Sequence, residues 1–166
     1  MLTAATTARG QHGIVLIEAL IGILVFTIGI IGLIGLQGTT IALAADAQYR
    51  AEASAVAERI VTQIWLGVDR SSLANQQASL QSYRYNTTGA NCAFSGGATD
   101  TTNAILAAWV ASFTTAGGST YLPGATTAMQ QVLVDTTNNN LVTVTVCWQA
   151  PKDPVPRQHV VTASIS

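Results

Sequence analysis

The stretch GIVLIEALIGILVFTIGIIGLIGLQ, residues 13–37, decides the fold class of this chain. From Ile14 to Leu36 it has Ile, Leu, Val or Phe at 16 of 23 positions, and Glu18 is its only charged residue. A run of that length is long enough to cross a bilayer as a helix. Its apolar side chains favour insertion by about 5–10 kcal/mol, against a cost of about 3 kcal/mol for one central charge. The stretch therefore predicts a membrane-spanning helix despite the glutamate.

The flanks of this run distinguish it from a cleaved secretory signal. Such a signal has an apolar run of about 7–15 residues after a basic cluster. Here the run is longer, contains an acid, and follows 13 residues with one clear cation, Arg9. The small residues Ala42 and Ala44 still offer a signal-peptidase site, which would place the mature N-terminus at Ala45. A plain single-pass anchor has the same hydropathy, and only the position of Glu18 separates it from a filament subunit.

Glu18 shares one face of the predicted helix with Gly22, Gly29 and Gly32. At 100° per residue all four fall within about 40° of one helical line. Glycine exposes backbone for close helix packing, although glycines are also common in membrane helices generally. An ionisable group inside an apolar span needs a partner, such as the N-terminal amine of a neighbouring subunit. The face therefore predicts a subunit assembly surface.

After Gln37 the helix is predicted to continue to Leu66 as an amphipathic segment. Apolar residues recur there at steps of three and four. These are Ile41, Ala45, Tyr49, Ala53, Val56, Ile60 and Ile64. Asp46 and Arg50 are four apart and are predicted to form a solvated pair. From Ile14 to Leu66 the helix would span about 80 Å at 1.5 Å per residue.

Residues 67–166 predict one small head with an irregular connection followed by antiparallel strands, so the fold class is α+β. The alternation of Val142, Val144 and Val146 with Thr143, Thr145 and Cys147 predicts one apolar face that packs on the helix and one polar face that points outward. Turn residues such as Pro123 and Gly124 punctuate the head. The predicted elements are a helix near Asn103–Phe113, a turn at Leu122–Gly124, a hairpin of Gln131–Asp135 and Leu141–Gln149 joined by Thr136–Asn140, a break at Pro151–Pro156, and a last strand His159–Ile165.

The two cysteines, Cys92 and Cys147, are 55 positions apart. That spacing excludes a zinc knuckle and a redox CxxC motif. A single disulfide is expected if the head lies outside the cytoplasm, and the alternative is two unpaired buried thiols.

Composition and charge argue against several functions. Charged residues are 9% of the chain and the net charge is −1, so no basic stripe exists and no direct nucleic-acid binding is predicted. His12 and His159 have no acid or cysteine at metal-ligand spacing, so no metal is predicted. Asp100 and Asp135 are expected to be turn residues. No phosphate-binding loop or nucleophile elbow is present. The sequence therefore predicts no catalytic residue, no cofactor and no enzymatic activity.

The segment Gly13-Ile14-Val15-Leu16-Ile17-Glu18 resembles the prepilin signature, in which a glycine ends the leader and glutamate is the fifth mature residue. Gly10 would place Glu18 eighth and fits that pattern badly. The resemblance implies a leader of residues 1–13, cleaved between Gly13 and Ile14 by a prepilin peptidase that then methylates the new amine. Ile14 stands where the family usually has phenylalanine.

Further residues resemble the PilV type of minor pilin in order and spacing: Gly29 to Gln37, Trp109, Leu122 to Gly124, and Val144 to Gln149. Trp109 and Trp148 are expected to be packing residues. The resemblance implies a single-pass bacterial inner-membrane protein with a cytoplasmic leader and a periplasmic head. Its expected partners are other pilins and minor pilins, the inner-membrane assembly platform and a tip adhesin. The alternatives are a minor pseudopilin of a type II secretion system and a tip-located binding module.

Overall fold

Helix α1 (His12–Gly67) is the longest element of the chain and runs without interruption for 56 residues. The computed structural model describes residues 12–118 and 120–166, so most of the predicted leader, residues 1–11, lies outside the described residues. The chain divides into two compact units, Met1–Asp46 and Ala47–Ser166. The prediction of one continuous helix from Ile14 to Leu66 is confirmed.

The core of the second unit is built on one stripe of α1. Five α1 residues are fully buried, and their steps of three and four place them on one helix face. They are Ala53, Val56, Ala57, Ile60 and Ile64. The sequence placed Ile41 at the start of this stripe, but Ile41 belongs to the first unit and its side chain is 70% exposed. The fully buried part of the stripe therefore begins only at Ala53.

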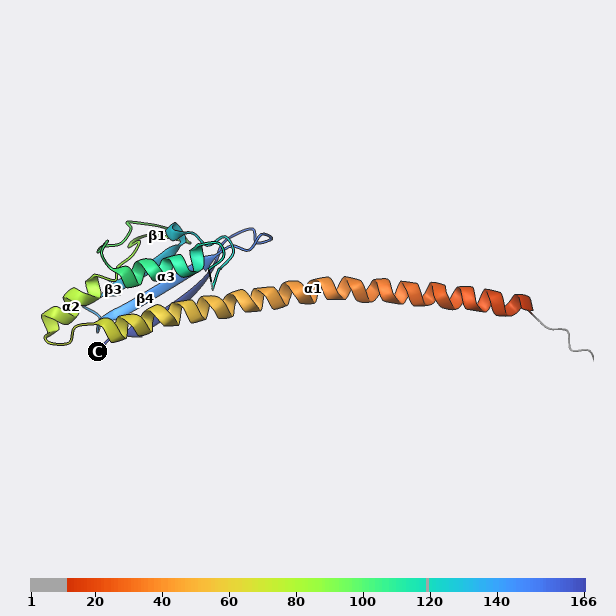
Figure 1. The fold of residues 1–166 in the computed structure, drawn as a ribbon, viewed down its shortest axis with the longest axis horizontal. Helices are drawn as coiled ribbons and strands as arrows, with labels where there is room; N and C mark the ends of the chain where they lie inside the picture. The colour runs from red at the N-terminus through yellow and green to blue at the C-terminus, as the bar shows by residue number, and fades with distance from the viewer. Residues whose placement is uncertain (1–11, 119) are drawn as a thin grey trace, which may run out of the picture. The chain divides into compact units, whose positions relative to one another are not determined.

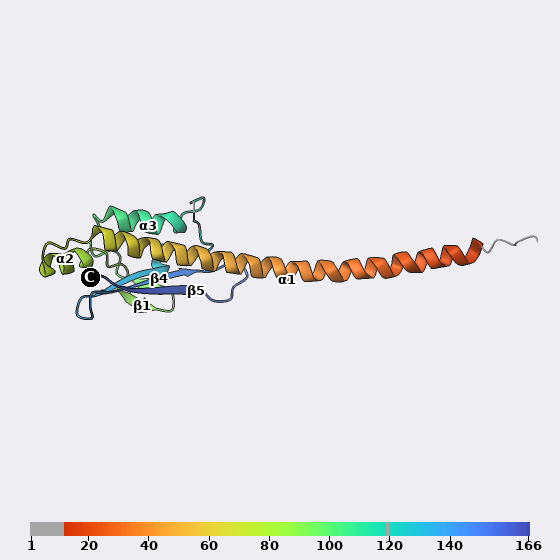
Figure 2. The same cartoon turned by 90° about the horizontal axis from the view of Figure 1, so that it is seen from below.

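Three antiparallel strands form the main sheet, in the order β3 (Gln130–Asp135), β4 (Leu141–Trp148) and β5 (Arg157–Ser164). The predicted hairpin and last strand are confirmed. In Figure 2, α3 (Ala104–Thr114) and the yellow half of α1 lie on one side of strands β4 and β5. The valines at 142, 144 and 146 of β4 are fully buried, as the alternation predicted.

The hairpin between β3 and β4 turns where the sequence has a run of short polar residues. Asp135 Oδ1 accepts hydrogen bonds from the backbone N–H and the hydroxyl of Thr137. Asn139 and Asn140 have φ of 49° and 51°, a left-handed conformation that asparagine tolerates better than most residues. These local preferences fix the strand register, in which Asp135 is paired with Leu141.

The polar face of β4 is not open to solvent throughout, contrary to the prediction. Thr145 is 6% exposed and Cys147 is fully buried. The short hairpin of β1 (Thr88–Ala90) and β2 (Ala93–Ser95) contributes Phe94 to the same buried cluster as Cys147. Cys147 is therefore buried because a second layer covers this end of the strand.

Two more short elements escaped sequence prediction. Helix α2 (Leu73–Gln81) is capped at its N-terminus by Ser72, whose hydroxyl accepts a hydrogen bond from the N–H of Asn75. The 3-10 helix η1 (Thr127–Met129) leads into β3. The predicted helix near residues 103–113 is confirmed as α3 in Figure 1, and Asn103 caps its N-terminus in the same way.

Buried amide side chains join the irregular connection to the sheet. The Asn86 side chain donates to the carbonyl oxygens of Thr127 and Gln130 and accepts from the N–H of Gly97. The Gln130 amide binds both the N–H and the carbonyl of Cys147 across the strands. Each bond satisfies a polar group that burial would otherwise leave without a partner.

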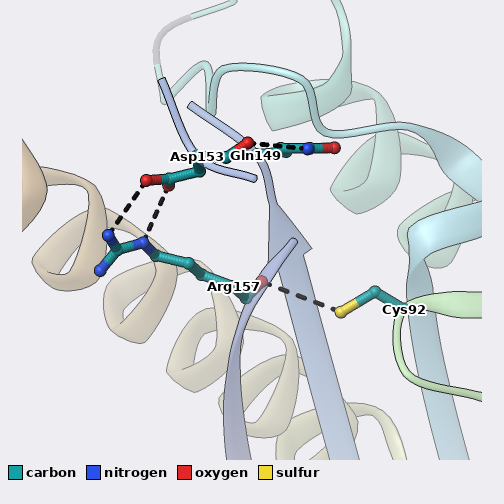
Figure 3. A network of polar contacts seen from close by, with 4 residues as sticks. All are labelled: Cys92, Gln149, Asp153 and Arg157. Carbon is teal, nitrogen blue, oxygen red and sulfur yellow. Dashed lines mark hydrogen bonds and ion pairs between the residues drawn. The ribbon is translucent and has the colours of Figure 1, made fainter. Parts of the chain in front are cut away.

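The predicted break between β4 and β5 is held in place by side chains. Arg157 donates two hydrogen bonds to the Asp153 carboxylate, at 2.8 and 3.0 Å, and the Gln149 amide donates to the Asp153 carbonyl (Figure 3). The guanidinium lowers the pKa of Asp153. The Cys92 sulfur lies 3.8 Å from the Arg157 carbonyl oxygen in the same view. That approach is a packing contact, because a disulfide sulfur carries no proton to donate.

The predicted disulfide is confirmed, since Cys92 and Cys147 are bonded to each other. Cys92 follows Asn91 in the two-residue turn between β1 and β2, where both have positive φ. The bond therefore ties this hairpin to β4.

Replacing both Cys92 and Cys147 by alanine should lower the free energy of unfolding by about 3–5 kcal/mol, because the bond closes a loop of 55 residues in the unfolded chain. Alanine avoids placing a hydroxyl at the buried Cys147 position. The measurement is denaturant unfolding of the full chain in detergent. Reduced wild-type protein is the control and should approach the variant; a difference below about 1 kcal/mol between oxidised protein and variant would contradict this expectation.

Candidate assembly surface

In the first unit, no other described part of the chain covers the apolar run of α1. Every residue from Ile14 to Ala44 is exposed, and the most apolar 18-residue window of the helix is 0% buried. A core helix of a water-soluble protein would have this surface covered. Helix α1 is therefore long and apolar enough to cross a membrane, as the sequence predicted.

Glu18 lies on the exposed helix surface inside this run. In residues 12–118 and 120–166 it forms no hydrogen bond or ion pair. An acid in apolar surroundings is costly unless it meets a donor or a cation. The carboxylate therefore requires a partner from outside the described part of the chain once the helix is surrounded by lipid.

The three glycines that share the Glu18 face are also open. A Cβ built at Gly22, Gly29 or Gly32 would meet no atom within 4 Å. Since α1 is regular through these positions, the four predicted assembly residues lie on one helix surface. Gly13 and Ile14 both fall within α1, where the helix has already begun at His12.

Thr27 is the polar residue of the run that the sequence argument left aside. Its hydroxyl donates to the Leu24 carbonyl oxygen at 2.8 Å. Thr39 and Thr40 donate in the same way to Leu36 and Gln37. These hydroxyls are satisfied within the helix and need no partner from lipid or protein.

Trp109 and Trp148 are packing residues, as predicted. Trp109 is 3% exposed and Trp148 is 1% exposed. Both belong to the core cluster that contains the buried α1 stripe.

Asp100 and Asp135 do not come together as a site, and each forms a local turn as predicted. Asp100 accepts hydrogen bonds from the hydroxyl and the N–H of Thr102, at 2.6 and 2.9 Å. Asp135 has the same two bonds with Thr137. In each pair the side-chain bond is the main cause that lowers the pKa of the aspartate, and the backbone bond adds to it.

Within the described ranges no group of three or more His, Cys, Asp or Glu side chains is placed to hold a metal ion. His159 lies on β5, and His12 begins α1.

Comparisons with protein-family models, curated proteins and solved structures return no match to this chain. The class of protein therefore rests on the fold and the surface described above. The chain is an α+β protein of pilin-like layout, with one long N-terminal helix packed on small antiparallel sheets. The same helix is apolar enough for a single membrane crossing.

Replacing Thr102 by valine should raise the pKa of Asp100 toward its ordinary value, because the hydroxyl donor is lost. Since the folded pKa is the lowered one, the turn contributes stability above the unfolded pKa and loses it as the pH falls through the folded pKa. Carboxyl carbon NMR titration measures the shift. Thr101→Val is the matched control, and an equal shift in both variants would contradict the role of Thr102.

Proposed function

We propose that this chain is a minor pilin of a type IV pilus, a filament subunit held in the inner membrane by α1 before assembly. The observation that supports this most directly is the single helix of 56 residues, whose first part is exposed and apolar and whose second part buries one stripe in the core of the head. A simple anchor requires no such continuity. A filament subunit does, because its anchor becomes its packing surface.

In this proposal the leader is cut between Gly13 and Ile14 on the cytoplasmic face by a prepilin peptidase, and the new amine of Ile14 is methylated. Glu18 then pairs with the N-terminal amine of a neighbouring subunit, a charge-assisted contact at low dielectric. Gly22, Gly29 and Gly32 let the neighbouring helix approach closely along the same face. The contact sets the axial register during assembly, together with other pilins, minor pilins and the assembly platform.

The head has an extracytoplasmic role in this proposal, which its disulfide supports. The subunit would help to initiate pilus assembly and would remain near the tip, in reach of a tip adhesin. A minor pseudopilin of a type II secretion system would share the leader and helix. A deletion strain separates the two, because loss of surface pili with secretion intact supports the pilin.

The mature protein isolated from membranes should begin at Ile14, because Gly13 ends the proposed leader. Intact mass and N-terminal sequencing measure this, and an added methyl group would appear in the same mass. A mature N-terminus at Ala45 would show instead that the apolar run is a secretory signal. If the isolated chain were uncut, the result would support a plain single-pass membrane anchor instead.

Replacing Glu18 by alanine should leave cleavage intact and block entry into filaments, because the neighbouring amine loses its carboxylate partner. The measurement is the ratio of variant to wild-type subunit in sheared filaments, with mature length checked in membranes. Glu58→Ala, which removes an exposed acid from the head half of the same helix, is the control and should enter normally. Normal incorporation of the Glu18 variant would contradict the proposed contact.

A further inference from the structure

The head contains a groove between α1 and α3 that the filament contact does not use. It is an open groove of about 410 Å³, lined by Arg59, Gln63, Ala104, Ile105, Ala108, Trp109 and Ser112. All lining residues belong to the second unit.

Trp109, which lines the groove, is held in place by two contacts. The Trp109 indole N–H donates to the Val56 carbonyl oxygen of α1 at 2.8 Å. The ring of Trp109 also packs edge-to-face against Phe113, with centroids 5.2 Å apart. A side chain anchored in this way does not have to be ordered when an occupant arrives, which lowers the cost of binding.

The α3 wall leaves room because its residues at four-residue steps are small. Ala104, Ala108 and Ser112 follow one another along the helix on one face. The Ser112 hydroxyl donates its hydrogen bond to the Trp109 carbonyl oxygen, so it has no free proton to offer to an occupant. Ile105 is 39% exposed beside this row. The surface therefore suits the apolar side chains of another helix, spaced three or four residues apart.

The α1 wall carries the charge. Arg59 is the only charged residue that lines the groove, and it has no hydrogen bond or ion pair among the residues that the structure describes. Its neighbour Glu58 lies outside the lining and accepts a hydrogen bond from Ser54. A cation at the rim of an apolar groove favours an occupant with a carboxylate beside its apolar face.

We infer that the α1–α3 groove binds an acidic amphipathic helix of another filament subunit. Two or more apolar side chains enter above Trp109, and a carboxylate at the edge of the helix pairs with Arg59. The identity of the partner as a filament subunit rests on the proposed function, whereas the chemistry of the groove does not. The partner would thus be recognised by the head, independently of the Glu18 contact.

The test uses the full chain in detergent, with its three tryptophans replaced by fluorotryptophan so that Trp65, Trp109 and Trp148 each report by fluorine NMR. The probe is a helical peptide of about 14 residues with leucines at i, i+4 and i+7 and flanking glutamates. A second peptide has lysine in place of each glutamate. The acidic peptide should shift the Trp109 signal, and the basic peptide should bind about tenfold more weakly.

Arg59→Glu should reverse this preference. Lys152→Glu is the matched control, because it makes the same charge change at an exposed position outside the groove and should leave the preference intact. Equal binding of both peptides, or a shift at Trp65 without one at Trp109, would overturn the inference. If the chain never enters filaments but still binds the acidic helix, the filament proposal fails alone. If it enters filaments and Trp109 does not respond, only the groove inference fails.

Discussion

Burial of one stripe of α1 is the constraint on which the rest of the head depends. The stripe contributes fully buried side chains such as Val56, Ile60 and Ile64 to a core that also contains the valines of β4. Full burial of a residue of this size stabilises by about 1.5–3 kcal/mol, so the stripe is among the largest favourable contributions that a head of this size has. The sheet and α3 bury their apolar side chains in the same core cluster as this stripe, so they depend on α1 for their packing.

The short elements of the head cover core surface that the α1 stripe and the main sheet leave exposed. β1 and β2 carry too few apolar side chains to fold alone, and the disulfide at Cys92 holds them over the end of β4. Asn86 and Gln130 satisfy backbone groups that this cover removes from water. A chain with few charged residues thus holds the short elements of its head with buried amide hydrogen bonds and one covalent bond.

The elements that the sequence could predict are those whose period is long enough to be recognised. The α1 stripe, α3 and the β3–β4 hairpin each repeat apolar residues over several turns or strand positions. Helix α2 has only Leu73 and Leu80 as large apolar residues, so its period is weak and the cap at Ser72 was its main signal. The β1–β2 hairpin turns at Asn91 and Cys92, where a cysteine with positive φ is not a usual turn signal. Burial of Thr145 and Cys147 could not be inferred, because it depends on that hairpin reaching β4.

The predicted assembly residues raise a different difficulty, because Glu18 and the three glycines on its face make no contact that the fold of one chain depends on. The sequence reveals them because each is unfavourable in a single helix. Glu18 is an acid in an apolar run, and each glycine lowers the stability of the helix. The groove residue Arg59 differs in being exposed to water, but it too is a charge beside apolar surface with no partner in the described chain. Neither feature is known to stabilise the isolated chain, and each is available to a second molecule of complementary chemistry. The two residues lie in different units and differ in sign. In the proposed filament, Glu18 therefore sets the register in the membrane and Arg59 selects a neighbour through the head.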